Sequence, residues 1–243
     1  FRSDADVHPE KITTRAGTGS RFELCAPEGR IDVEVAGLGE TAVANALAAA
    51  AAALAAGAPL ADVPKGLARY QPVGGRLETL ALPEGGILIN DTYNANPQSM
   101  EVALRVLADT ESGASKAAGI MGNGVQRIAV LGDMGELGEA GSEAHHQTGR
   151  LAARLGIDQL FAFGELAEQI AEGARAAGMD PSRIHVGRDW RDVGERVRAR
   201  LEGCDRVLVK GSRAMRMERI VQHLVSQGEG AGTPETSRAR SER

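Results

Sequence analysis

Aromatic side chains are scarce in this 243-residue sequence, at 3% of residues, and the formal net charge of −5 leaves no basic excess. A nucleic-acid interface needs a basic surface, and single-strand binders add aromatic rings on which bases stack. We therefore expect no nucleic-acid partner. Long hydrophobic runs are also missing, because the alanine-rich run at 46–56 is shorter than the roughly 20 residues that cross a bilayer. We expect a globular chain that does not insert into membranes.

Cysteine is equally rare. Cys25 and Cys204 lie far apart and outside any metal-type spacing, which favours buried free thiols in a reducing compartment. No signal-peptide pattern is present, so we expect a cytoplasmic location. His8, His185 and His223 are scattered, with no carboxylate or cysteine at ligand spacing, and we assign none of them to a metal site.

Beyond a Pro-Val-Gly-Gly linker at 72–75, short apolar runs alternate with amphipathic helical patterns. We place strands near 76–82, 86–90, 127–131, 158–163, 183–187 and 205–210. Helices are expected near 97–108, 142–155, 165–177, 189–201 and 213–225. This alternation predicts an α/β fold, a Rossmann-like and mostly parallel sheet with helices on both faces.

The first third of the chain has a different pattern. Weakly alternating runs within 11–35, separated by Pro27-Glu-Gly29, predict a β-hairpin, and a helix ended by Gly57 and a second helix at 60–70 follow. We therefore divide the chain into residues 1–73, a domain at 74–227 and a disordered tail at 228–243. Glycine, alanine and serine at 111–126 predict a flexible insertion.

The stretch 86–100 concentrates polar residues directly behind a predicted buried strand. Asn96 can cap a helix that Pro97 opens, because proline is tolerated at the first helical position. Asp91, Tyr93 and Asn94 then gather with Asn96 at a strand's carboxyl end, where open α/β sheets bind ligands. The alternative is a helix cap with ordinary loop polars.

Four motifs in register resemble the Mur ligase family, and the match runs from about residue 30 to 225. They are Gly74-Gly-Arg-Leu77, Asp91-Thr-Tyr-Asn-Ala-Asn-Pro-Gln-Ser-Met100, Leu131-Gly-Asp-Met-Gly-Glu-Leu-Gly138 and Leu208-Val-Lys-Gly-Ser-Arg213. The resemblance implies an ATP- and Mg²⁺-dependent ligase of cell-wall peptidoglycan synthesis that activates a carboxylate as an acyl phosphate. The third motif resembles members that add D-alanyl-D-alanine to UDP-N-acetylmuramoyl tripeptide, since diaminopimelate-adding members usually carry Asp-Asn-Pro-Arg there.

The resemblance also implies a nucleotide site. Asn45 would hydrogen-bond the adenine, Arg76 would act in catalysis on the γ-phosphate, Asp91 would accept from the ribose hydroxyls, and Tyr93 would lie beside base or sugar. Asn94 and Asn96 would complete the nucleotide-binding set. The sequence departs from the family at residues 41 and 42, where threonine and alanine replace the usual histidine and asparagine. Unremarkable alternatives are a polar helix end for Asn45 and a solvated strand-end charge for Arg76.

A second set of residues would contact the dipeptide. Asp133 or Glu136 would meet its ammonium group, and Ser142 would cap the next helix and place His145 in its first turn. His145, or its neighbour His146, would be a catalytic residue, although a structural hydrogen-bonding role is the commoner one. By the same resemblance, the dipeptide carboxylate would be bound where the last strand opens the final helix, by three side chains: Lys210, Ser212 and Arg213.

The glycine-rich phosphate loop of the family, G-x-x-x-x-G-K-[ST], occurs nowhere in the sequence. Because the sequence opens on Phe1 without an initiator methionine, we interpret it as the C-terminal portion of a longer enzyme. Residues 1–73 would then be a remnant of the central ATP-binding domain, the magnesium ligands would lie upstream, and the isolated chain would be an inactive monomer. Alternatives are another Mur ligase, a folylpolyglutamate synthetase relative, or a stand-alone Rossmann-like binding module.

Overall fold

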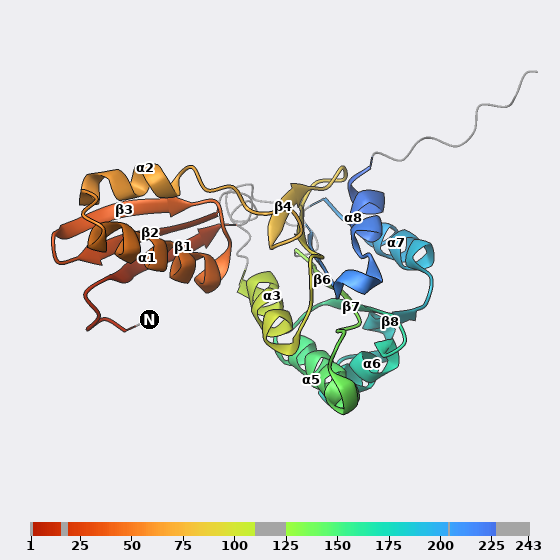
Figure 1. Cartoon of the computed structure of the whole chain (residues 1–243). Coiled ribbons are helices and arrows are strands. Elements are labelled where there is room, and N and C mark those ends of the chain that lie inside the picture. The colour runs from red at the N-terminus through yellow and green to blue at the C-terminus, as the bar shows by residue number, and fades with distance from the viewer. Residues whose placement is uncertain (1, 16–18, 110–124, 204, 227–243) are drawn as a thin grey trace, which may run out of the picture.

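The computed structural model describes residues 2–15, 19–109, 125–203 and 205–226, and the chain forms two units that each contain one β-sheet (Figure 1). The expected disordered tail and nearly all of the expected insertion lie outside these residues. None of the described helices is both long and apolar enough to cross a membrane.

The N-terminal unit is a three-stranded antiparallel sheet covered by helices. Its strands are β1 (His8–Arg15), β2 (Gly19–Ala26) and β3 (Gly29–Val35), in the order β1-β2-β3. The predicted hairpin is β2-β3, whereas β1 is a third strand that the sequence analysis did not assign as such. Helices α1 (Gly39–Ala55) and α2 (Val63–Leu67) cover the face that carries Phe22, Leu24 and Val33.

The second unit is a six-stranded sheet in the order β4-β5-β9-β6-β7-β8. Its strands are β4 (Glu78–Ala81), β5 (Ile87–Asp91), β6 (Arg127–Gly132), β7 (Gln159–Phe163), β8 (Ile184–Gly187) and β9 (Arg206–Lys210). Only the edge pair β4-β5 is antiparallel. The mostly parallel sheet predicted from the sequence is confirmed.

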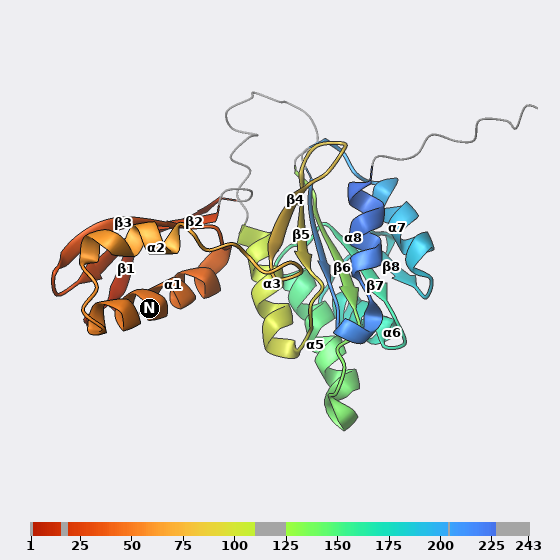
Figure 2. The same ribbon diagram turned by 45° about the horizontal axis from the view of Figure 1, so that its top comes forward.

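Helices cover both faces of this sheet, as its doubly buried strands require (Figure 2). One face packs on α3 (Pro97–Asp109), α5 (Gly141–Arg154) and α6 (Ala167–Ala176). The other packs on α7 (Trp190–Arg198) and α8 (Glu218–Val225), and the partly buried Trp190 packs against the same apolar cluster. Alternate strand residues serve the two cores: Ile89 and Leu208 face α3, while Leu88 and Val207 face α8.

The order of the strands reverses around β9, because the last strand inserts between β5 and β6. Such a reversal leaves a crevice at the carboxyl ends of the strands, which is where open α/β sheets bind ligands. The residues that follow β5, β6 and β9 therefore lie at one edge of the sheet. The N-terminal unit lies next to α3 of the second unit, beside this edge of the sheet (Figure 1).

Two helix starts differ from the sequence prediction. Helix α5 begins at Gly141, so Ser142 lies inside it and makes no cap, and the residue at the cap position has no side-chain cap bond. The final helix begins at Glu218, because Arg213–Met215 forms a separate 3₁₀ turn that ends at Arg216 with a positive φ of 48°. The Lys210-Gly-Ser-Arg213 segment therefore does not open a long helix.

Helices α5 and α6 pack at two glycines, and we predict that one added methyl group disrupts them. A Cβ at Gly149 would overlap the backbone oxygen of Ile170. Although alanine is the better helix former, Gly149→Ala should lower the free energy of unfolding by about 2–3 kcal/mol in denaturant melts. In the control Gly66→Ala, where a Cβ meets nothing, stability should rise by up to about 1 kcal/mol. Equal effects at the two sites would contradict the packing argument.

Candidate functional site

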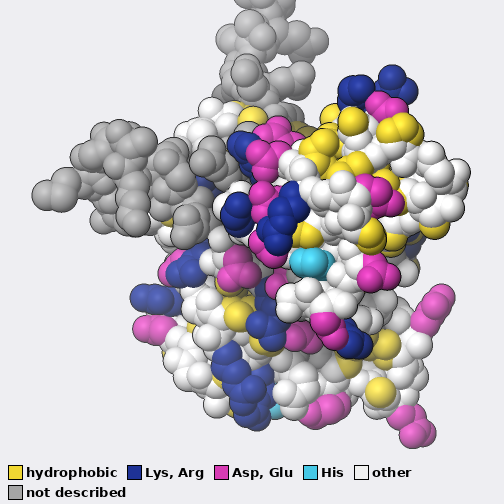
Figure 3. All heavy atoms as spheres, turned by 90° about the vertical axis from the view of Figure 1, so that its left-hand side faces the viewer, with side chains coloured by type: hydrophobic (Ala, Val, Ile, Leu, Met, Phe, Trp, Pro, Cys, Tyr) yellow, Lys and Arg dark blue, Asp and Glu magenta, His cyan; other side chains and the backbone are white. Residues whose placement is uncertain are grey.

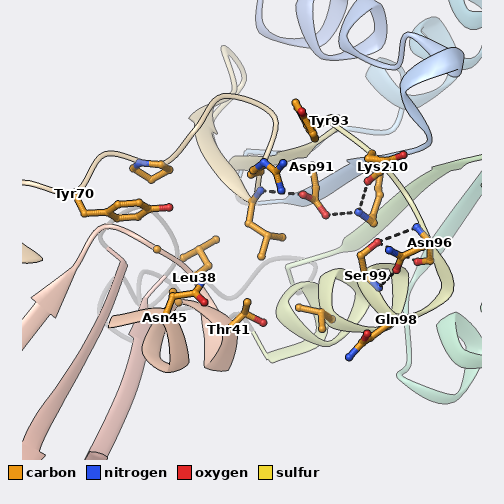
Figure 4. Close-up of a pocket in the computed structure, with 17 residues that line it drawn as sticks. Leu38, Thr41, Asn45, Tyr70, Asp91, Tyr93, Asn96, Gln98, Ser99 and Lys210 are labelled. Atoms are coloured by element: carbon orange, nitrogen blue, oxygen red, sulfur yellow. Dashed lines mark hydrogen bonds and ion pairs between the residues drawn. The ribbon is translucent and has the colours of Figure 1, made fainter. Parts of the chain in front are cut away.

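A cavity of about 460 Å³ lies between the N-terminal unit and the carboxyl edge of the six-stranded sheet (Figure 4). Its size is within the range of small-molecule and cofactor sites. One wall comes from residues 37–45 and 70–72, and the other from 76–77, 91–102 and β9. Of the expected nucleotide residues, the cavity brings together all six: Asn45, Arg76, Asp91, Tyr93, Asn94 and Asn96.

An ion pair joins the two strand ends at the cavity. Asp91 and Lys210 are partners in the parallel β5-β9 ladder, and Lys210 Nζ lies 2.6 Å from Asp91 Oδ2. The Lys210 side chain is 1% exposed and also donates to the carbonyl oxygen of Asn94 at 2.9 Å. Burial lowers the pKa of Lys210, and the charge of Asp91 acts against that shift. Lys210 thus lies beside the expected ribose residue in the cavity wall.

The Gly74–Leu77 turn is fastened to this strand end. The amide of Leu77, at a positive φ of 49°, donates to Asp91 Oδ1 at 3.1 Å, and the amide of Tyr93 donates to the Gly75 carbonyl at 2.9 Å. The guanidinium of Arg76 consequently stacks on the Tyr93 ring, with its Cζ 4.0 Å from the centroid. Tyr93 is 46% exposed, so the stacked pair lies where a ligand can reach the cation.

Asn96 is the N-cap that the sequence predicts for α3. Its Oδ1 accepts from the amide of Ser99 at 2.8 Å, while Ser99 Oγ accepts from the amide of Asn96 at 3.0 Å, in a reciprocal capping arrangement. Asn94 Oδ1 accepts from the next amide, that of Ala95, at 2.9 Å. The side-chain oxygens of Asn94 and Asn96 thus each accept a hydrogen bond from a backbone amide. Both residues line the cavity, and their role in binding a nucleotide stays a prediction.

The N-terminal wall contains residues that the sequence analysis did not single out as binding residues. Leu38, Tyr70 and Pro72 line it beside Asn45, and Thr41 lines it at one of the two positions that depart from the family pattern. Tyr70 and Tyr93 are the only two tyrosines of the sequence, and both line the same cavity. In a chain so poor in aromatics, an aromatic residue just before the linker was the signal that could have indicated Tyr70.

The loop after β6 is held by its own polar groups. Asp133 accepts from the amides of Glu165 at 2.8 Å and Leu166 at 3.1 Å, just ahead of α6, while Glu136 is exposed at a positive φ of 61°. His145 is 0% exposed: its Nε2 accepts from the amide of Met134 at 2.9 Å, and its Nδ1 lies 2.6 Å from the Gly141 carbonyl. These contacts fit a neutral tautomer and favour the structural alternative for His145.

The segment after β9 lies against this loop, since the amide of Ser212 donates to the carbonyl of Asp133 at 2.9 Å. Ser212 is buried, whereas the Arg213 side chain is 70% exposed and has Glu218 at 3.8 Å. The structure therefore separates the expected carboxylate-binding set, with Lys210 in the cavity wall and Arg213 at the surface.

Outside the cavity, the sheet register brings together three residues that are separated in sequence. His8 pairs with Cys25 across β1-β2, and ligand atoms of His8, Glu10 and Cys25 lie within 4.8 Å of one another. Contrary to the spacing argument, His8 thus has both a carboxylate and a cysteine beside it. Arg30 binds Glu10 at 2.7 Å, and burial raises the pKa of the Cys25 thiol.

On the face of the molecule formed by the N-terminal unit, acidic and basic side chains are interspersed (Figure 3).

The fold matches that of a known ligase family. A family model described as Mur ligase, glutamate ligase domain, matches residues 75–213, more than half of the chain. The chain belongs to the Mur ligase family.

Within the family, the chain is similar to ligases that carry the following names. The UDP-N-acetylmuramoyl-tripeptide--D-alanyl-D-alanine ligase of Escherichia coli (strain K12) is 35% identical over 215 residues, which is 86% of this chain and 42% of that protein. MurF from Acinetobacter baumannii superposes with a TM-score of 0.76 at 31% identity, over 93% of this chain and 46% of the other. MurF ligase from Thermotoga maritima, in complex with ADP, has a TM-score of 0.72 at 22% identity over 91% and 46%, a likeness of fold. The chain spans less than half the length of these proteins.

We predict that His145 and His146 differ in what they do for the fold. His145→Ala would leave the buried Met134 amide without its acceptor and open a cavity where the imidazole packs, so the free energy of unfolding should fall by about 3 kcal/mol. His146→Ala is the matched control, because its Nδ1 has no hydrogen-bond partner, and it should lose about 1 kcal/mol or less. Guanidinium unfolding measures both variants; a larger loss at His146 would contradict the structural role of His145.

Proposed function

We propose that this chain is the C-terminal portion of an ATP- and Mg²⁺-dependent ligase that joins D-alanyl-D-alanine to UDP-N-acetylmuramoyl tripeptide. The observation that carries the proposal is the cavity, which unites the six expected nucleotide residues from two units of the chain. The identity of 35% to the E. coli relative favours this activity over that of another family member or of a stand-alone binding module.

The cavity has the polar groups that an adenine nucleotide needs. The Asn45 amide offers a donor and an acceptor to the purine edge, and the two tyrosines offer flat surfaces beside it. Asp91 would accept from ribose hydroxyls, and the Arg76 guanidinium would bind the terminal phosphate in a bidentate manner. Stacking on Tyr93 orients Arg76 before the phosphate arrives, so less freedom is lost on binding.

Magnesium would be bound chiefly outside this chain's described residues. Asp91 is the one acidic side chain among the described residues lining the cavity, and its two oxygens already accept from the Leu77 amide and Lys210. A hard cation prefers several free oxygen ligands. We therefore propose that segments upstream supply the metal ligands and the phosphate loop, as the family resemblance implies.

In the proposed reaction, a carboxylate oxygen of the tripeptide attacks the γ-phosphorus and ADP leaves. The amine of the dipeptide then attacks the acyl carbon, loses a proton and displaces phosphate. This chain's contribution is positional and electrostatic: it fixes the nucleoside and places one cation at the charge that develops on the phosphate oxygens. His145 would support the loop after β6 rather than transfer a proton, because both ring nitrogens are already engaged.

The dipeptide would bind at the same edge of the sheet, beyond β6 and β9. Glu136 is the exposed carboxylate of the loop after β6, and it is better placed than the engaged Asp133 to meet the ammonium group. The exposed Arg213 guanidinium, beside Ser212, would meet the carboxylate. In this proposal, residues 1–73 belong to the central ATP-binding domain and residues 74–227 form the C-terminal domain of the ligase. The enzyme would be monomeric and located in the cytoplasm.

We expect no product from the 243-residue chain alone, because phosphoryl transfer needs the missing phosphate loop. Joined to the phosphate-loop part of the E. coli relative, the chain should release phosphate from ATP in the presence of UDP-muramoyl tripeptide and D-alanyl-D-alanine. The assay compares the dipeptide with glutamate and diaminopimelate as amines, with the intact E. coli enzyme as a control. Release that depends on glutamate or diaminopimelate, or release by the chain alone, would refute the proposal.

A further inference from the structure

The burial of the Lys210 ammonium in the cavity wall calls for a structural or functional explanation. Both residues line the cavity, but the Lys210 side chain is 1% exposed against 13% for Asp91, so the carboxylate is the more accessible of the two. A charge is buried at high cost unless it is paired and hydrogen-bonded. Nζ has two partners, Asp91 Oδ2 at 2.6 Å and the Asn94 carbonyl at 2.9 Å (Figure 4).

We propose that Lys210 is a positioning residue that sets the ribose selectivity of the nucleotide site by fixing the Asp91 carboxylate, without touching the nucleotide itself. The inference rests on the proposed function, in which Asp91 accepts from the ribose. It gives Lys210 a different role from the carboxylate binding expected from the family motif.

The orientation of the Asp91 carboxylate depends on which of its lone pairs already accept hydrogen bonds. An ionised carboxylate has about four acceptor positions. The Leu77 amide takes one position on Oδ1 at 3.1 Å, and Lys210 takes one on Oδ2. The two donors lie on different elements and prevent the carboxylate from rotating. The remaining positions are therefore held in one orientation, as acceptance from two neighbouring hydroxyl groups requires.

Lys210 also supports the surroundings of Asp91. Its bond to the Asn94 carbonyl holds the loop between β5 and α3, which carries Tyr93. Asp91 in turn holds the Leu77 amide, next to Arg76. The ammonium of Lys210 lies 2.6 Å from the Asp91 carboxylate, and hydrogen bonds in which a partner is charged are stronger than those between neutral groups. Loss of Lys210 should therefore loosen these segments as well as the carboxylate, and a comparison of ATP with its deoxy analogues isolates the contribution of the sugar hydroxyls.

The experiment measures the preference for ribose hydroxyls. Isothermal titration of the 243-residue chain with ATP, 2′-deoxy-ATP and 3′-deoxy-ATP gives a ratio of dissociation constants for each variant. The variants are Lys210→Met, Asp91→Asn and the double variant. Lys65→Met is the matched control, because Lys65 in α2 is 75% exposed and its ion-pair partner among the described residues is Asp62, just before that helix. Thermal melts confirm that each variant is folded.

We expect the wild-type chain to prefer ATP over at least one deoxy analogue by about tenfold, as for a hydrogen bond to a charged acceptor. Lys210→Met should reduce this ratio to nearly one, as Asp91→Asn does, and the double variant should show no further loss. Lys65→Met should keep the wild-type ratio. If Lys210→Met does not fold, Lys210→Gln takes its place: its amide has two N–H donors but no charge and a shorter reach, so the ratio should still fall.

Three results would overturn the inference, and they are distinguishable. A wild-type ratio in Lys210→Met, together with its loss in Asp91→Asn, would remove Lys210 from sugar recognition and leave the proposed nucleotide site intact. ATP binding without any preference for ribose hydroxyls in the wild-type chain would remove the Asp91 contact itself, and this inference with it. A ratio lost equally in Lys65→Met would show a general effect of lost charge and would also overturn it.

Discussion

The ion pair between Lys210 and Asp91 is the contact on which the cavity wall depends. It joins the carboxyl ends of β5 and β9. Asp91 also accepts from the turn that carries Arg76, and Lys210 donates to the loop that carries Tyr93. Breaking a buried pair from one side leaves an uncompensated charge, at a cost of about 3–5 kcal/mol. The pair is possible only because β9 inserts beside β5, so the strand order and the site have the same origin.

Around this pair, both units of the chain contribute residues to the lining of the cavity. The six-stranded sheet supplies the charged groups, and the N-terminal unit supplies Asn45 and Tyr70 on the opposite wall. On the other side of β9, the loop after β6 is held by His145 and by Asp133, which accepts from the amides ahead of α6. These contacts fix the side chains around the cavity before any ligand binds, and the proposed phosphoryl transfer would use this preorganisation.

Much of the fold follows from local sequence patterns. The apolar runs of the parallel strands and the Asn96-Pro97 helix start predict their elements because the physical cause lies within a few residues. Strand β1 was not predicted: it contains Pro9, and its register shifts between Glu10 and Thr13, which breaks the alternation. Ser142 failed as a cap because α5 begins one residue earlier.

The properties of the site were harder to predict, because they depend on contacts between distant segments. Lys210 at a strand end has the pattern of an exposed anion-binding residue, and its burial follows only from the insertion of β9. The proximity of His8 and Cys25 depends on the strand register rather than on spacing. His145 was expected in the helix after β6 and lies in α5, yet its bond to the Met134 amide appears only once the loop after β6 is folded against that helix.

The central claim is that the cavity between the two units binds an adenine nucleotide. The most direct measurement is a titration of the ¹⁵N-labelled chain with ADP, followed by amide chemical shifts. The account predicts saturable shifts at Asn45 and Tyr70 on one wall and at Arg76, Asp91 and Tyr93 on the other, with Lys65 and Glu101 unchanged. Shifts confined to residues outside the cavity, or no shifts at saturating ADP, would contradict it.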